Sequence, residues 1–308
     1  MLSRNAGSAR DVRGKASPVF AVNGVLGWRA LRQPRQVSQT LRPRPPAIAS
    51  MNVLLLLGGI ADPKLPLPTA PSMPTLLSHR RERGMLSPFD AAALEIALKL
   101  RDSDAATRID ALVAAGPDDA LLRHVAGYRL DRVAALDPAR VVACDAMAVA
   151  RDLAHAGNAL DCLPQILLIG REFGDMDDGS VPPLLAEALG LPHVGLALSL
   201  EMRDGTPWAL HQRGGGLIWR ALREPVVVSV TNDARNRLRH ALLKNVMAAK
   251  RLRFDACESS PAAVAALTLR HVVRMENSSR SRACQMLQGD APAQARALAD
   301  VLLAHARP

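Results

Sequence analysis

Four carboxylates crowd one stretch of this chain, residues 170–192, which reads GREFGDMDDGSVPPLLAEALGLP. They are Glu172, Asp175, Asp177 and Asp178. Three chemistries suit such a cluster: it can hold a metal ion, supply a catalytic carboxylate pair, or cap a helix that faces a nucleotide. The metal interpretation is weak, because Asp-x-Asp-Asp-Gly is similar to the start of a calcium loop but no Glu follows at the required distance. A catalytic pair needs a cleft and a substrate, and nothing else in the sequence supplies one.

The elements around this loop alternate between strand and helix patterns. Apolar runs predict buried strands at 53–57, 109–114, 133–136, 165–169 and 225–230. Helical patterns occupy 87–100, 118–127, 137–156, 184–189, 242–250 and 291–306. This alternation predicts an α/β fold with a doubly wound, mostly parallel sheet and helices on both faces. The acidic loop would then lie at the carboxyl end of a strand, where such sheets bind ligands.

The remaining segments read differently. Residues 62–86 are rich in Pro and Ser and are predicted to form a loop, and residues 255–290 are predicted to be mostly irregular. Strand segments are expected within 194–221, broken at Asp204-Gly205 and at the glycine run 214–216, which favours a hairpin turn over a phosphate loop.

One helix start is well defined by its residues. Ser87 suits the N-cap, Pro88 the first helical position, and Asp90 can reach back as the acid of a capping box. Phe89 begins the apolar stripe that should face the core.

The charge of the chain argues against nucleic-acid binding by its body. The net charge is +10, but residues 1–50 carry +8 of it, so residues 51–308 carry only +2. Aromatic residues make up 3% of the chain, which leaves few stacking platforms for single strands. The four cysteines (Cys144, Cys162, Cys257 and Cys284) have no metal-ligand spacing, and free thiols are expected. No apolar run is long enough to span a bilayer, and Val53–Leu57 is far too short.

Three parts of the chain are expected to differ in kind. Residues 1–50 are basic and without periodicity, and we expect a disordered leader: a mitochondrial transit peptide, a basic tail, or sequence before a true start at Met51. The last interpretation is favoured, because a strand pattern follows Met51 at once. Residues 51–250 are expected to form the α/β domain, and residues 251–308 an arm and helix that pack on a partner.

Six motifs in order resemble the beta subunit of electron transfer flavoprotein, over about residues 52–306. NVLLLLGGIAD is similar to the family's opening strand, SPFD to its Asn-Pro-Phe-acid turn, and AAGP to its second strand exit. The stretch from Gly170 aligns with Gly-Lys-Gln-Ala-Ile-Asp-Asp-Asp and its helix. Residues 212–230 resemble the family's Gly-Gly to Leu-Pro-Ala-Val-Val segment, and Asn245-Val246-Met247 its Asn-Ile-Met segment.

The resemblance implies that the doubly wound sheet is of the Rossmann-like, adenine-nucleotide-binding type with an extended C-terminal arm. It also implies an electron carrier rather than an enzyme. The family's beta subunit pairs with an alpha subunit that holds redox-active FAD, and it usually binds a structural AMP or, in a minority branch, a second FAD. The resemblance implies that electrons pass from flavoprotein dehydrogenases towards a quinone oxidoreductase and the quinone pool. It implies a cytoplasmic location in a bacterium, or the mitochondrial matrix if residues 1–50 are a transit peptide. The rival hypothesis is an adenine-nucleotide-binding regulator or enzyme that acts without an alpha subunit.

The resemblance also assigns residues to two sites. The nucleotide would lie among three strand exits and one turn, at Leu56, Ser87, Pro88, Phe89, Asp90, Ala115, Glu172, Asp175, Asp177, Asp178, Gly179, Ser180 and Val181. Partner docking would use Leu243, Lys244, Asn245 and Lys250. The family's loop ends Asn-Gln-Thr-Gly, and Val181 and Pro182 here lack the hydroxyl and the N–H of that pattern. We therefore expect weak or absent AMP, with a heterodimer that has lost this nucleotide as a third alternative.

Overall fold

The computed structural model describes residues 51–66, 72–142, 145–159, 164–175, 177–257 and 286–305. The expected leader 1–50, Cys144, Cys162, Cys284 and most of the stretch 255–290 lie outside the described residues.

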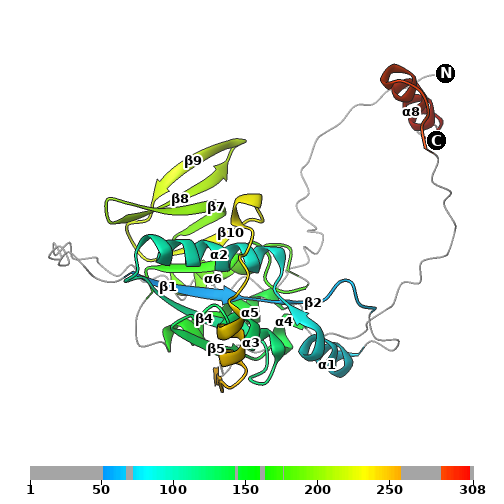
Figure 1. Ribbon diagram of the computed structural model, residues 1–308. Helices are drawn as coiled ribbons and strands as arrows, with labels where there is room; N and C mark the ends of the chain where they lie inside the picture. The colour runs from blue at the N-terminus through cyan, green and yellow to red at the C-terminus, as the bar shows by residue number, and fades with distance from the viewer. Residues whose placement is uncertain are drawn as a thin grey trace, which may run out of the picture. The chain divides into compact units, whose positions relative to one another are not determined.

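A nine-stranded sheet forms the centre of the described chain (Figure 1). Its parallel strands are β1 (Asn52–Leu57), β4 (Arg108–Ala114), β5 (Arg132–Leu136), β6 (Ile166–Gly170), β7 (His193–Arg203), β10 (Val226–Val230) and β11 (Asp255–Cys257). Two antiparallel strands, β8 (Thr206–Arg213) and β9 (Gly216–Ala221), extend it beyond β7. The order is β11-β5-β4-β1-β6-β10-β7-β8-β9, which confirms the doubly wound, mostly parallel fold. β2 (Ile60–Ala61) and β3 (Gly84–Met85) form a separate ribbon.

Helices cover both faces of the sheet, because the buried strands are apolar on both sides. On one face α2 (Pro88–Ser103) and α3 (Ala120–Ala126) share a core cluster with Val53, Leu55 and Leu57. On the other face α5 (Ala146–Asn158) and α6 (Val181–Leu189) pack on Leu54 and Leu56. The remaining helical elements are α1 (Met73–Arg83), α4 (Ala139–Val142), α7 (Leu243–Ala249), α8 (Ala291–His305) and the 3-10 turn Ala234–Asn236.

Three sequence predictions were wrong in detail. The loop predicted at 62–86 contains α1, which begins at a capping box: Ser72 Oγ accepts from the Thr75 amide at 3.4 Å, and Thr75 Oγ1 accepts from the Ser72 amide at 2.8 Å. The helix predicted at 137–156 is two helices, because Asp145 caps a new start at Ala146. Asp255–Cys257, predicted to be irregular, pairs with β5 as an edge strand.

No helix within the described ranges combines the length and the apolar character that a membrane crossing requires.

Candidate functional site

The carboxyl ends of β1 and β6 define the place where this topology positions ligands. The chain runs from β1 to β4 and β5 on one side, then crosses β1 to β6 and β10 on the other. The crevice at such a switch point is the usual ligand site of a doubly wound sheet. Here it is bordered by Gly58-Gly59, which follow β1, and by residues 171–180, which follow β6. The structure therefore brings the acidic loop to the expected edge.

Asp90 holds the β1 exit. Its carboxylate accepts hydrogen bonds from the amides of Gly58 at 3.1 Å and Gly59 at 2.8 Å. It also completes a capping box with Ser87. The Ser87 amide donates to the Asp90 carboxylate at 3.1 Å, and the Asp90 amide donates to the Ser87 hydroxyl at 3.0 Å. Asp90 is fully buried, and this desolvation raises the pKa of its carboxyl group. The predicted cap is confirmed, and one side chain joins α2 to the end of β1.

Asp177 caps the helix that the acidic loop opens. Its Oδ1 accepts from the amides of Gly179, Ser180 and Val181 at 3.0, 2.8 and 3.3 Å, and from Ser180 Oγ at 3.0 Å. Its Oδ2 accepts from the Phe173 amide at 2.9 Å. The amides that suit a phosphate at a helix start are therefore already paired with a carboxylate of the same chain. Of the three chemistries open for the acidic cluster, helix capping describes this residue.

Asp175 pairs with a buried arginine that the sequence patterns do not reveal. Arg80 of α1 is 5% exposed, and its Nη1 lies 2.5 Å from Asp175 Oδ2. Its Nη2 donates to the carbonyls of Gly58, Gly59 and Ala114, at 3.0 Å for Gly59. Arg80 thus satisfies carbonyl groups at the ends of both β1 and β4. Its neighbours Arg81 and Arg83 are exposed, so nothing in the sequence run marks Arg80 as buried.

The loops after β1 and β6 meet backbone against backbone. A Cβ atom on Gly58 would lie 2.4 Å from the Gly174 nitrogen and 2.9 Å from the Phe173 carbonyl carbon. Gly174 has φ +91, and a Cβ there would lie 2.2 Å from Val141 Cγ1. The Phe173 side chain is 2% exposed and belongs to the apolar cluster under α5 and α6. A cavity of about 230 Å³ remains beside it, bordered by Val149, Ser180 and Asp177.

The other predicted nucleotide residues lie in different surroundings. Leu56 is fully buried in the cluster under α5, whereas Ala115 is buried in the cluster on the opposite face of the sheet. Phe89 is half-buried and packs closely against Gly170, since a Cβ on Gly170 would lie 2.9 Å from the Phe89 Cβ. Pro88 is exposed. Glu172 forms a 4.0 Å ion pair with Arg171, and Asp178 is exposed. Within the described part of the chain, no three or more His, Cys, Asp or Glu residues are placed to hold a metal ion.

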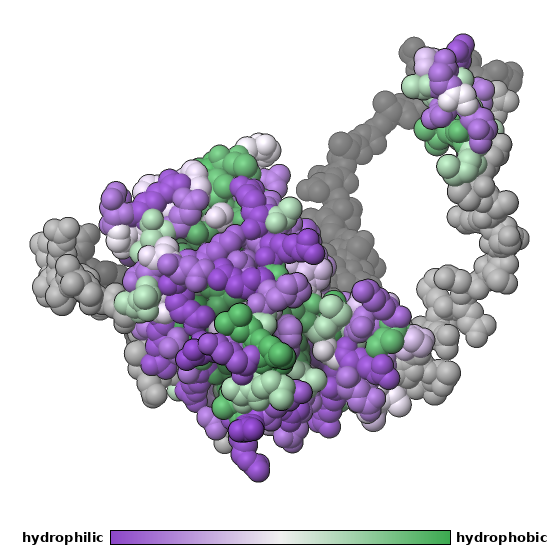
Figure 2. Space-filling view, in the orientation of Figure 1, coloured by the Kyte–Doolittle hydropathy of each residue, from purple (hydrophilic) through white to green (hydrophobic). Residues whose placement is uncertain are grey.

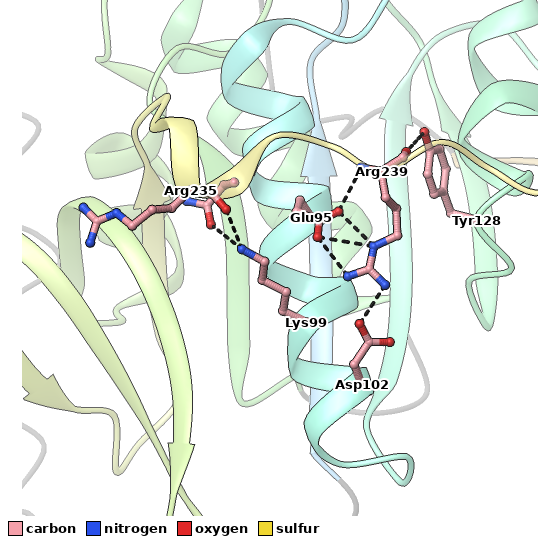
Figure 3. Close-up of polar contacts among 7 residues, drawn as sticks. Glu95, Lys99, Asp102, Tyr128, Arg235 and Arg239 are labelled. Atoms are coloured by element: carbon pink, nitrogen blue, oxygen red, sulfur yellow. Dashed lines mark hydrogen bonds and ion pairs between the residues drawn. The ribbon is translucent and has the colours of Figure 1, made fainter.

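The predicted docking residues follow a segment that α2 anchors (Figure 3). Arg239 donates from Nε and Nη2 to Glu95, at 3.0 Å to Oε2 and 2.8 Å to Oε1, and the Arg239 amide donates to Oε2 at 3.1 Å. Nη1 reaches Asp102 at 2.7 Å, and Tyr128 Oη donates to the Arg239 carbonyl at 3.0 Å. These bonds raise the pKa of Arg239, with the Glu95 contact as the largest cause. Lys99 Nζ donates to the Arg235 carbonyl at 2.6 Å.

Beyond this anchor, α7 presents apolar side chains to solvent. Leu243 is 76% exposed, Leu242 60% and Met247 52%, and Figure 2 shows an apolar patch over the region of α7 with hydrophilic surface around it. Lys244 and Lys250 are exposed and Asn245 is half-buried, while Ala249 is the residue of α7 that is buried. A cavity of about 600 Å³ lies beside α7 at the amino end of β5, bordered by Asn245, Leu252 and Phe254 among others. This larger cavity is remote from the strand exits that a doubly wound fold uses for nucleotides.

Comparison with known proteins places this architecture in a family. The model of the electron transfer flavoprotein domain matches residues 75–261, more than half of the chain. Electron transfer flavoprotein subunit beta of Syntrophomonas wolfei is 31% identical over 169 residues, which cover 54% of this chain and 65% of the relative. The subunit of the same name from Megasphaera elsdenii is 30% identical over 174 residues, 54% of this chain and 64% of its own. The matched part thus spans just under two thirds of these relatives. The chain belongs to the family of electron transfer flavoprotein beta subunits.

Proposed function

We propose that this chain is the beta half of an electron transfer flavoprotein heterodimer and that it serves electron transfer rather than a reaction of its own. The observation that carries the proposal is the family match over residues 75–261. The partner is an alpha subunit that holds most of the redox-active FAD. Electrons arrive from flavoprotein dehydrogenases and leave towards a quinone oxidoreductase and the quinone pool.

The anchored segment before α7 supports a docking role within this proposal. Transient partners are held by a few well-placed apolar side chains, and such side chains bind more tightly when the backbone that carries them is preorganised. Leu243 is the most exposed leucine among the described residues of the body, and the Glu95–Arg239 contact holds the backbone a few residues before it. Lys244 and Lys250 add positive charge beside it, which favours a partner with an acidic rim.

Co-purification tests the heterodimer. The full chain, tagged, is expressed with an electron transfer flavoprotein alpha subunit from the same organism, and the purified product is expected to contain both chains and to show flavin absorbance. Mixing with a reduced flavoprotein dehydrogenase is expected to reduce that flavin. A chain that purifies alone and turns over or binds an adenine nucleotide would favour the rival hypothesis of an enzyme or regulator that needs no alpha subunit.

Two leucine variants test the docking role. Leu243→Ala in the heterodimer is expected to lower the rate of dehydrogenase-dependent flavin reduction at least about tenfold at limiting concentrations, as for the loss of a hot-spot side chain. The matched control is Leu217→Ala, since Leu217 on β9 is also exposed, at 56%. Equal effects of the two variants, or no effect of either, would contradict docking through α7. Flavin content and subunit stoichiometry, measured on each variant, separate a docking defect from loss of the heterodimer.

A further inference from the structure

The chain's own side chains occupy much of the crevice at the switch point of this sheet, where a cavity of about 230 Å³ remains. We infer that the crevice takes no adenine nucleotide, because Asp177 and Asp90 occupy the amides, and Phe173 the space, that a nucleotide would need. This departs from the AMP that the family resemblance implies. The inference goes beyond the proposed function and does not depend on it, since it concerns contacts within this chain alone.

The helix-start amides at the phosphate end of the crevice are already paired. The amides of Gly179, Ser180 and Val181 and the Ser180 hydroxyl all point to Asp177 Oδ1, within 3.3 Å. The next residue, Pro182, has no N–H. A phosphate would have to displace this carboxylate while remaining close to it, and two anions at such a distance repel. Asp177 therefore acts as an internal substitute for the anion.

The space beside Phe173 is smaller than an ordinary ligand pocket. Ligand pockets usually measure about 300–1,000 Å³, whereas the cavity beside Phe173 measures about 230 Å³. The crevice cannot widen by a simple separation of its walls, because Gly58 and the Phe173–Gly174 backbone are already in direct contact. Removing Phe173 from the cluster would also expose a side chain that is now 2% exposed.

The backbone groups at the strand exits are satisfied as well. Asp90 takes the amides of Gly58 and Gly59, and Arg80 takes their carbonyls and that of Ala114. Buried backbone groups that await a ligand are expected to be unpaired or to face water. Here both polarities are paired internally, and the paired residues come from α1 and α2.

Nucleotide content is the first test. The full chain, purified both alone and with its alpha subunit, is denatured, and released nucleotides are separated by chromatography and quantified against protein. We expect no AMP, ADP or ATP from the chain alone, and FAD as the sole nucleotide of the heterodimer. One AMP for each chain in either preparation would overturn the inference. The chain is also assayed alone. Failure to form a heterodimer would therefore count against the proposed function, while the nucleotide content of the chain alone would still test the inference.

Added nucleotide is the second test. A site with a dissociation constant of 10 µM, saturated by 1 mM AMP, would raise the Tm of a domain of this size by roughly 5–10 °C. We expect no shift with AMP beyond that produced by sodium chloride of equal ionic strength. A saturable, AMP-specific rise in Tm would overturn the inference even if the purified protein carried no nucleotide.

Asp177→Ala is the third test, with Asp178→Ala as its control. If Asp177 substitutes for an anion, its removal frees the helix amides, and 50 mM inorganic phosphate is expected to raise the Tm of Asp177→Ala several degrees more than that of the parent. Asp178 is adjacent but exposed, so Asp178→Ala is expected to respond like the parent. Equal phosphate responses in all three proteins would refute the role of Asp177. Should Asp177→Ala fail to fold, the nucleotide content of the parent decides the question.

Discussion

Replacing Glu95 by Gln should show how much the anchor of residues 234–242, the segment before α7, contributes to stability. The Glu95 side chain is 6% exposed, and it accepts from the Arg239 amide and from two guanidinium nitrogens at 3.3 Å or less. Gln keeps the shape of Glu but loses the charge and turns one acceptor into a donor that faces the guanidinium. The variant therefore removes the two-point ion pair while leaving the packing of α2 intact.

The magnitude follows from the exposure of the two partners. A hydrogen bond to a charged group is worth about 1.5–3 kcal/mol, and breaking a fully buried pair costs about 3–5 kcal/mol. The upper range does not apply here, because the Arg239 side chain is 41% exposed and keeps its contact with Asp102. We expect Glu95→Gln to lower the free energy of unfolding by about 2 kcal/mol.

Urea denaturation of the full chain measures this loss, and Asp102→Asn is its control. Asp102 is 57% exposed and bonds the same guanidinium at 2.7 Å, so its substitution should cost no more than about 0.5 kcal/mol. Amide hydrogen exchange should rise in residues 234–249 of Glu95→Gln and stay at parental levels in Asp102→Asn. Equal costs for the two variants, or unchanged exchange in Glu95→Gln, would refute the idea that the buried end of this network anchors the segment.

Three further predictions concern other parts of the fold. Burial lowers the pKa of His193 in the folded state. The neutral imidazole therefore stabilises the fold above about pH 6.5, and this stability is lost as the pH falls towards the pKa of the folded state. His193→Gln should flatten the pH dependence of the free energy of unfolding between pH 7.5 and 5.5 by up to about 1.4 kcal/mol per pH unit. Gly174→Ala, at φ +91 and against Val141, should abolish or severely weaken folding, while Gly190→Ala, at φ +64 in open space, should cost only about 1–2 kcal/mol by thermal denaturation. Ser87→Ala should cost about 1 kcal/mol through loss of its cap, and the same denaturation experiment would contradict this if Tm were unchanged.

Local patterns in the sequence predicted the features that depend on neighbouring residues. The cap at Ser87 and Asp90 was visible because its two halves lie three residues apart, and the buried strands were visible as apolar runs. The short helix α1 was missed because its capping box ends in Thr75 and it carries no apolar stripe.

The contacts that fill the carboxyl edge could not be found in this way. Arg80 meets carbonyls 21 to 34 residues away and Asp175 95 residues away, and no spacing in the sequence marks such partners. The sequence shows four acids in one loop, but only their contacts in the fold separate Asp177, which caps its own helix, from Asp175, which pairs with α1. The sequence predicts that the strand exits at Leu56 and Ala115 share the carboxyl edge of the sheet, but it does not show that the two side chains belong to opposite core clusters.

The route of the chain between β10 and β11 has a consequence for how this protein can diversify. β10 lies among the central strands and β11 at the far edge beyond β5. Residues 231–254 connect them by crossing over α2 and α3, without pairing in the sheet. The crossing is tied down at Arg239 and again at Ala249, which is 1% exposed, and the residues between them are largely at the surface. Substitutions in these surface residues change the side chains that a partner protein can contact, while the pairing of the strands stays the same. We therefore predict that exchanging residues 240–248 between relatives transfers partner preference and leaves the fold of the recipient protein intact.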